Sequence, residues 1–154
     1  MVFLVSSNIS PADERQLRTY VQTTLQACRQ GTLALVDGIN TAVLQQQAHP
    51  DFSPVGWHLG HIAFTESLWI LEHLAQQPCS FSDYRMLFAA DGLPKSQRQQ
   101  LPALGDLLRF LNDVRQRTLT YLADAPLTEK RRLWHWLIQH ECQHSETISL
   151  VMAL

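Results

Sequence analysis

Apolar residues recur every three to four positions along most of this 154-residue chain, a spacing that predicts amphipathic helices. The first predicted helix begins at Ser10, where a capping serine precedes a proline and two acidic residues, and it continues to about Val36. Its apolar stripe comprises Leu17, Tyr20, Val21, Thr24, Leu25 and Cys28. A short helical piece is predicted within residues 37–47, before the break at His49-Pro50.

Three more long helices are predicted in the remaining chain. The serine–proline start signal recurs at Ser53 and opens a helix over residues 53–76, and further helices are expected over residues 102–123 and from about residue 128 to the end. In the helix over 102–123, the inward positions are Leu107, Phe110, Leu111, Val114, Thr118 and Tyr121. The sequence therefore predicts an all-α fold, a four-helix bundle with long connections, formed as a single domain over residues 1–154.

The longest connection, residues 77–101, is poor in regular pattern and contains several proline and glycine breakers. A connection of this length inside a compact domain usually carries function or short helices of its own. We expect one such helix over residues 82–90.

Composition excludes several classes of partner. A net charge of −2 and an isoelectric point near 6.4 give no electrostatic reason to expect binding to nucleic acid. No apolar run is long enough to span a membrane. The three cysteines, at positions 28, 79 and 142, are irregularly spaced and do not form a disulfide framework, so we expect a reducing cytoplasm.

Two histidines in the last helix point to metal chemistry. His140 and His144 are four residues apart, so they share one helix face and can bind the same ion. At ~100° per residue, this face coincides with the apolar stripe that is expected to point into the bundle. The stripe comprises Leu133, Trp136, Leu137, Thr147, Ile148 and Val151.

A third imidazole is expected from the helix over residues 53–76. His61 aligns there with Trp57, Phe64, Leu68 and Leu71, whereas His58 lies ~60° off that stripe. We therefore expect His61 to be the third ligand and His58 to lie beside the ligands or at the surface. Three imidazoles with open positions are typical of a catalytic site, and they suit zinc, iron, nickel or copper.

Two motifs carry a family resemblance. Residues 53–61 read Ser-Pro-x-x-Trp-His-Leu-Gly-His, and residues 140–147 read His-Glu-x-Gln-His-x-Glu-Thr. Both resemble motifs of the metal-binding helical domain of ergothioneine-biosynthesis sulfoxide synthases, a branch of the DinB-like superfamily. A weaker similarity, Tyr-Arg-x-Leu-Phe, occurs at residues 84–88. The resemblance spans nearly the whole chain.

The resemblance implies a DinB-like four-helix bundle in which His61, His140 and His144 bind a divalent metal, with Fe(II) favoured and Zn or Ni as alternatives. It places Gln143 beside the substrate imidazole. Glu146 belongs to the family motif, but it points ~120° away from the ligand face. We therefore expect Glu146, with Glu141, Glu66 and His58 as further candidates, to orient the metal-bound imidazoles rather than bind the ion. No residue is assigned as catalytic.

The family enzymes also carry a C-terminal domain resembling formylglycine-generating enzyme, which contributes the catalytic tyrosine and much of the substrate pocket. The resemblance therefore implies one half of a three-His non-haem iron oxidoreductase, forming a C–S bond and a sulfoxide, with a separate partner of that type. One alternative is a stand-alone metal-dependent thiol S-transferase, and another is a non-catalytic, metal-stabilised interaction module. The expected partners are a small-molecule thiol, the formylglycine-generating-enzyme-like protein and, as another assembly, a second copy of the chain.

Overall fold

The computed structural model describes residues 10–154, so the first nine residues of the predicted domain lie outside it. Within this range there are helices and no strands, which confirms the all-α fold class. The elements are α1 (Pro11–Leu35), α2 (Thr41–Gln45), α3 (Val55–Glu66), the π-helix η1 (Ser67–Leu74), the 3-10 helix η2 (Ser82–Tyr84), α4 (Arg85–Phe88), the 3-10 helix η3 (Lys95–Gln97), α5 (Leu104–Leu122) and α6 (Arg131–Met152).

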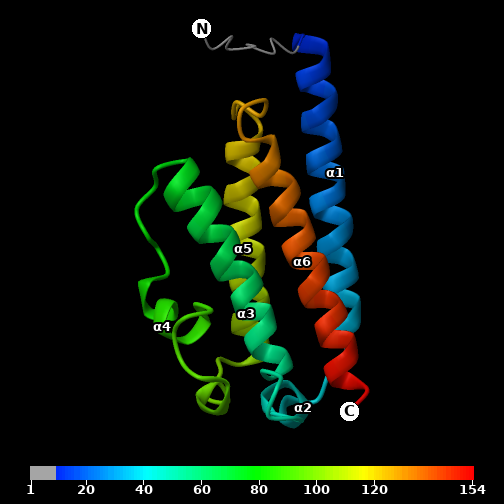
Figure 1. Cartoon of the computed structure of the whole chain (residues 1–154), viewed down its shortest axis with the longest axis vertical. Coiled ribbons are helices and arrows are strands. Elements are labelled where there is room, and N and C mark those ends of the chain that lie inside the picture. Colours follow the sequence, from blue (N-terminus) through cyan, green and yellow to red (C-terminus); the bar gives the residue numbers. More distant parts are fainter. Residues whose placement is uncertain (1–9) are drawn as a thin grey trace, which may run out of the picture.

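The long helices form a bundle in which α1 packs along α6 and α3 packs along α5 (Figure 1). Both α3 and α5 run in the same direction, opposite to α1 and α6 (Figure 1). Because α3 ends at the opposite end of the bundle from the start of α5, the chain between them must travel back along the whole bundle. This return path explains the long connection, which contains η2, α4 and η3 and passes beside α3.

The two serine–proline start signals differ in outcome. Ser10 caps α1 as predicted, because its Oγ accepts a hydrogen bond from the Asp13 backbone N–H at 3.2 Å. The same role predicted for Ser53 is wrong, because Pro54 occupies the cap position of α3 and provides no side-chain cap. The Ser53 hydroxyl instead accepts a hydrogen bond from Arg98 Nη1 at 3.0 Å, a charge-assisted bond inside the protein.

The helix predicted over residues 53–76 forms, but it is not a single α-helix. From Ser67 it widens into η1, with an i→i−5 hydrogen bond from the Ala75 N–H to the Ile70 carbonyl at 2.8 Å. The change of register makes Ile70 fully buried and leaves Trp69 41% exposed. A helical wheel with ~100° per residue therefore does not predict which side chains are buried after the end of α3.

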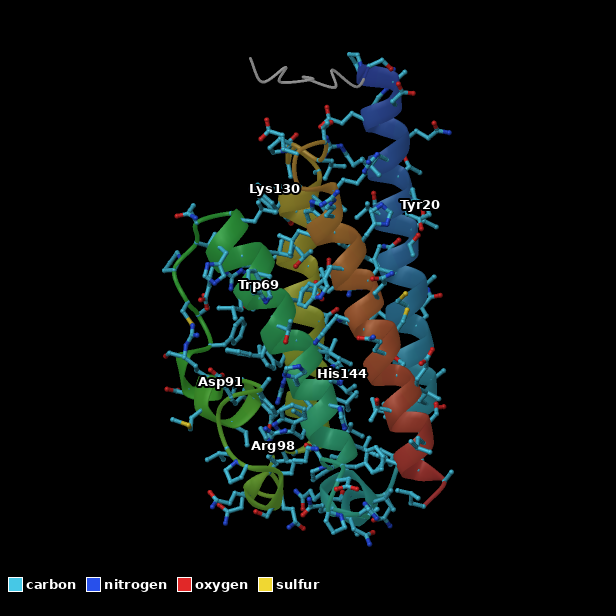
Figure 2. The ribbon with its side chains drawn as sticks, in the orientation of Figure 1. Tyr20, Trp69, Asp91, Arg98, Lys130 and His144 are labelled. Carbon is cyan, nitrogen blue, oxygen red and sulfur yellow. The ribbon has the colours of Figure 1, made fainter. Side chains whose placement is uncertain are left out.

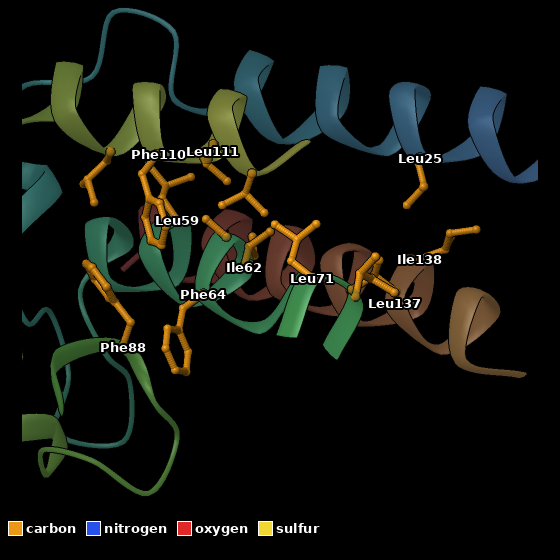
Figure 3. Close-up of a cluster of buried hydrophobic side chains, with 14 of the residues drawn as sticks. Leu25, Leu59, Ile62, Phe64, Leu71, Phe88, Phe110, Leu111, Leu137 and Ile138 are labelled. Atoms are coloured by element: carbon orange, nitrogen blue, oxygen red, sulfur yellow. The ribbon is translucent and has the colours of Figure 1, made fainter. Parts of the chain in front are cut away.

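The buried core is continuous through the bundle and consists mainly of leucine, isoleucine, valine and phenylalanine (Figure 3). In α6 the predicted stripe is wrong at one position, because Trp134 is fully buried whereas Trp136 is 40% exposed. Trp134 is buried because α6 packs against both α1 and α3, so its buried surface is wider than one stripe, whereas Trp136 lines an open cavity beside Trp69. No helix within residues 10–154 combines the length and the apolar character needed to cross a lipid bilayer.

Four charged side chains lie inside this core, one from each long helix: Arg29, Glu66, Arg115 and Glu141, each at most 7% exposed. Arg29 Nε donates to Glu141 at 2.7 Å, and Arg115 Nε donates to Glu66 at 2.8 Å. The second carboxylate oxygens of both glutamates also accept from Arg115 Nη2. Burial alone would raise the pKa of Glu66, but Arg115 and Arg29 hold it below its ordinary value. We call these four residues the charge quartet.

Candidate metal centre

The structure brings the three predicted histidines together between α3 and α6. One ring nitrogen each from His61, His140 and His144 lies within 4.8 Å of the other two. Figure 2 shows His144 where these two helices face each other. The Nε2 atoms of His61 and His140 are 3.1 Å apart. If two nitrogens bind the same ion at ~2.1 Å and the N–metal–N angle is a right angle, they are about 3.0 Å apart. The observed spacing therefore fits two ligands of one ion.

The ring of His61 is fixed from two sides. Its Nδ1–H donates to the Phe88 carbonyl at 2.7 Å, which leaves the Nε2 lone pair directed at His140. Trp57 stacks on the same ring with centroids 4.6 Å apart and an interplanar angle of 12°. The Trp57 indole N–H donates to the Leu87 carbonyl at 2.7 Å, and the Arg98 guanidinium lies 4.0 Å from the indole centroid. The long connection therefore positions a candidate ligand.

His144 is held by His58, which lies on the previous turn of α3 from His61. The Nδ1 atoms of His58 and His144 are 2.9 Å apart, so one of them donates a hydrogen bond to the other. This contact leaves the second ring nitrogen of His144 free for an ion. The structure thus places His58, only 6% exposed, beside a candidate ligand, and its position at the surface is excluded.

Burial keeps all four imidazoles neutral at neutral pH. It lowers the pKa of His140 from 6.5 to about 4, with a smaller contribution from His61, and it lowers the pKa of His61 in the same direction. Burial, followed by repulsion from the other three rings, lowers the pKa of His144 to about 2. Burial, followed by repulsion from His61, lowers the pKa of His58 to about 4. Neutral imidazole is the form that binds metals, so the cluster is prepared for coordination.

These shifts predict how the stability of the metal-free protein depends on pH. In the unfolded chain the imidazoles titrate near 6.5, so between about pH 6.5 and pH 4 the unfolded state binds more protons than the folded state. The free energy of unfolding should therefore be highest above about pH 6.5 and should decrease as the pH falls towards about 4. Thermal unfolding of chelator-treated protein at several pH values measures this, and the His58→Gln variant should give a flatter curve.

The exposed His49 offers the matched control. Its replacement by glutamine should leave the pH dependence of the unfolding temperature as in the original protein. An unfolding temperature that is constant from about pH 7 to pH 4 would contradict the assignment of the buried imidazoles as the titrating groups.

A cavity of about 250 Å³ opens directly at two of the histidines. Its wall is mostly apolar and aromatic, with the Trp69 and Trp136 rings edge to face at 5.9 Å. The lining residues are His61, Phe64, Thr65, Leu68, Trp69, Ala89, Ala90, Asp91, Trp136 and His140. An apolar pocket with a few polar groups next to metal-binding side chains is typical of a small-molecule site.

The other predicted site residues lie in different surroundings. Gln143 and Glu146 are on the exposed side of α6, and neither lines the cavity. Glu141 and Glu66 are buried, but their carboxylates accept hydrogen bonds from the arginines of the charge quartet. The acids thus hold the helices that carry the histidines, while the rings of the candidate ligands are contacted by His58, the Phe88 carbonyl and the stacked Trp57.

Sequence reasoning missed the two arginines of the charge quartet. Arg29 follows the buried Leu25 by four residues, and Arg115 follows the buried Leu111 by four, so each occupies a stripe position of its helix. An arginine on an apolar stripe indicates a buried acidic partner, because an unpaired buried charge is too costly to retain. That signal was available, but it does not identify which of the fourteen acidic residues is the partner.

A glycine next to His61 allows the connection to approach α3. A Cβ atom at position 60 would lie 2.1 Å from Cε1 of Phe88, a fully buried ring whose carbonyl accepts the His61 hydrogen bond. We expect Gly60→Ala to destabilise the protein by about 1–3 kcal/mol, because the ring must move. Urea unfolding measures this change.

Gly31 provides the comparison for that variant. It lies inside α1, and within residues 10–154 nothing beyond its chain neighbours and the backbone of its own helix comes within 4 Å of the Cβ position. Gly31→Ala should therefore stabilise the protein by about 0.5–1 kcal/mol through helix propensity alone. Equal effects of the two substitutions would refute the close packing of Phe88 on α3.

Comparison with known proteins identifies the family. A family model described as the DinB superfamily matches residues 24–148. Hercynine oxygenase of Mycolicibacterium thermoresistibile is 32% identical over 124 residues, covering 78% of this chain and 28% of the relative. Hercynine oxygenase of Mycobacterium tuberculosis is 32% identical over 128 residues, covering 80% of this chain and 30% of the relative. The chain therefore spans less than a third of the length of these curated relatives.

The family match covers most of the chain and includes all three histidines of the candidate centre. The helical bundle and the sequence relatives agree with it. The chain belongs to the DinB superfamily.

Proposed function

We propose that this chain is the metal-binding part of a hercynine-oxygenase-type enzyme, in which His61, His140 and His144 hold ferrous iron for oxygen-dependent C–S bond and sulfoxide formation. The observation that carries the proposal is the convergence of ring nitrogens from α3 and α6 at a spacing suited to one ion. The name of the relatives supports oxygenase chemistry over the other functions considered for a three-histidine site.

The donor set fits iron, although imidazoles also accept zinc and nickel. When bound, iron would supply oxygen activation and a template for the reacting thiol and imidazole groups. The chain itself contributes orientation: the Phe88 carbonyl fixes the tautomer of His61, and His58 fixes the ring of His144. Three protein ligands leave positions for substrates.

The cavity at His61 and His140 is the proposed entrance for the small-molecule thiol. Its aromatic wall, formed by Trp69 and Trp136, would exclude water on one side of the reacting groups. Both indoles are about 40% exposed, so this wall is accessible from outside the bundle.

We further propose that a formylglycine-generating-enzyme-like protein supplies the remaining catalytic groups. The match to the hercynine oxygenases covers only 28–30% of each relative, so more than two thirds of the length of each lies outside the matched residues. The residues around the histidines in this chain are mostly aromatic and aliphatic, with Thr65 and Asp91 as the polar groups of the cavity wall, so they suit binding and orientation of a substrate more than a full set of catalytic groups.

The test is an oxygen-uptake assay. The chain is loaded anaerobically with Fe(II), mixed with a candidate partner, and supplied with oxygen, a small thiol and N-methylated histidine. Uptake should exceed that of the chain alone and require both substrates. Uptake no greater than that of the isolated chain, or equal uptake with zinc, would contradict the proposal.

A further inference from the structure

Two cysteine thiols face each other across the α1–α6 interface. Cys28 Sγ and Cys142 Sγ are 3.2 Å apart, although 114 positions separate them in sequence. Cys28 is half-buried and Cys142 is exposed, so small reagents can reach the pair. The remaining cysteine, Cys79, is exposed in the connection after η1.

Two neighbouring contacts between α1 and α6 hold this pair of cysteines in register. The adjacent Arg29 and Glu141 form a 2.7 Å ion pair between the same two helices. One turn further, the hydroxyls of Thr32 and Ser145 are 2.8 Å apart. A disulfide requires the sulfurs to approach to ~2.05 Å, which is a movement of about 1 Å. We expect side-chain rotation to supply that movement while the helices stay in place.

We propose that Cys28 and Cys142 are a redox-modification site that forms a reversible intramolecular disulfide between α1 and α6. The proposal does not depend on the bound metal or on the reaction of the histidine cluster. Neither thiol belongs to the group of side chains that can share an ion.

The oxidant is a low-molecular-weight disulfide, as in thiol–disulfide exchange. The exposed Cys142 thiolate attacks one sulfur of the reagent, so that a mixed disulfide forms and one small thiolate leaves. Cys28 then loses its proton to solvent and attacks Cys142 Sγ, which releases the second small thiolate. Two protein thiols are oxidised to one disulfide, and the reagent disulfide is reduced to two thiols.

The order of these steps follows from exposure. Burial, together with the hydrogen bond and charge of Cys142, raises the pKa of Cys28 to about 12. Cys28 is therefore a poor first nucleophile. Modification of Cys142 removes its hydrogen bond to Cys28, and the 3.2 Å approach of the two sulfurs places Cys28 for the second attack.

The experiment uses the full chain with Cys79→Ser, because the exposed Cys79 would otherwise form its own mixed disulfide. The reduced variant is equilibrated with oxidised glutathione, and intact mass, free thiols after denaturation, and a non-reducing gel are recorded. We expect a monomer that has lost two hydrogens and both thiols and carries no glutathione. The matched Cys28→Ser/Cys79→Ser variant should retain glutathione on Cys142.

A second readout is thermal stability. Closing a loop of this size should raise the unfolding temperature of the oxidised Cys79→Ser variant by about 5–15 °C, reversibly with dithiothreitol and only when both cysteines are present. Accumulation of a glutathione adduct with Cys28 still free, or disulfide-linked dimers, would overturn the proposal. So would an equal temperature shift in the Cys28→Ser/Cys79→Ser variant.

Discussion

Replacing His140 with alanine is expected to abolish stoichiometric metal binding while the bundle stays folded. His140 Nε2 faces His61 Nε2 at 3.1 Å, so the substitution removes one of three candidate donors from the centre of the cluster. Losing even a hydrogen-bond partner of a metal ligand typically weakens binding ~10–100-fold, so we expect a loss of more than about 100-fold for the ligand itself. Anaerobic titration with Fe(II), and with Zn(II) in parallel, measures the affinity and the stoichiometry.

The control lies on the same helix. His135 is half-buried in α6 and its ring lies 5.8 Å from that of Tyr20, away from the other histidines. The His135→Ala variant should bind one ion as tightly as the original protein. If His140→Ala retained that affinity, or if both variants lost it equally, the three-histidine centre would be refuted. Circular dichroism of each variant separates lost binding from lost folding.

Replacing Glu141 with alanine is expected to destabilise the protein by about 3–5 kcal/mol. Glu141 is 2% exposed and accepts hydrogen bonds from Arg29, Arg115 and Thr32. Its removal leaves two buried guanidinium groups with only Glu66 as counter-charge, and an uncompensated buried charge is far more costly than a missing surface pair. Because a domain of this size is stable by only ~5–15 kcal/mol, the loss is a large fraction of the total. Urea unfolding at neutral pH provides the measurement.

Glu146 is the matched control, because it is the same residue type in the same helix but lies at the surface. Glu146→Ala should change the free energy of unfolding by no more than about 0.5 kcal/mol. A Glu141→Gln variant keeps the shape of the side chain and loses its charge. Its loss in the free energy of unfolding should therefore lie between those of Glu141→Ala and Glu146→Ala. A loss below about 1 kcal/mol for Glu141→Ala would show that the charge quartet is not needed for folding.

The parts of the structure that depend on neighbours in sequence were predictable. The long helices follow from their apolar spacing, and the pairing of His140 with His144 follows from four-residue spacing on one helix. The choice of His61 over His58 as the inward histidine of α3 rested on the same reasoning. In the structure His61 Nε2 approaches His140 Nε2 and His58 Nδ1 contacts His144 Nδ1, but both residues are buried, so the reasoning did not separate them by burial.

The parts that depend on several helices at once were not predictable in this way. The π-helical register of η1, the exposure of Trp136 and the use of the Ser53 hydroxyl by Arg98 each result from tertiary packing. The charge quartet requires four helices to meet at one point, and a single helix reveals only one of its members. The support of His61 by the Phe88 carbonyl similarly depends on the path of the connection.

His61 and His140 come from segments 79 positions apart, and only the native arrangement brings their nitrogens within reach of one ion. A cation bound there acts by mass action as a ligand of the native state alone. Each tenfold rise in free metal above the dissociation constant should add about 1.4 kcal/mol to the work of unfolding. Melting temperatures of this protein are therefore comparable only at a fixed, buffered metal concentration. Otherwise stabilisation by trace metal would be mistaken for the stability of the metal-free protein.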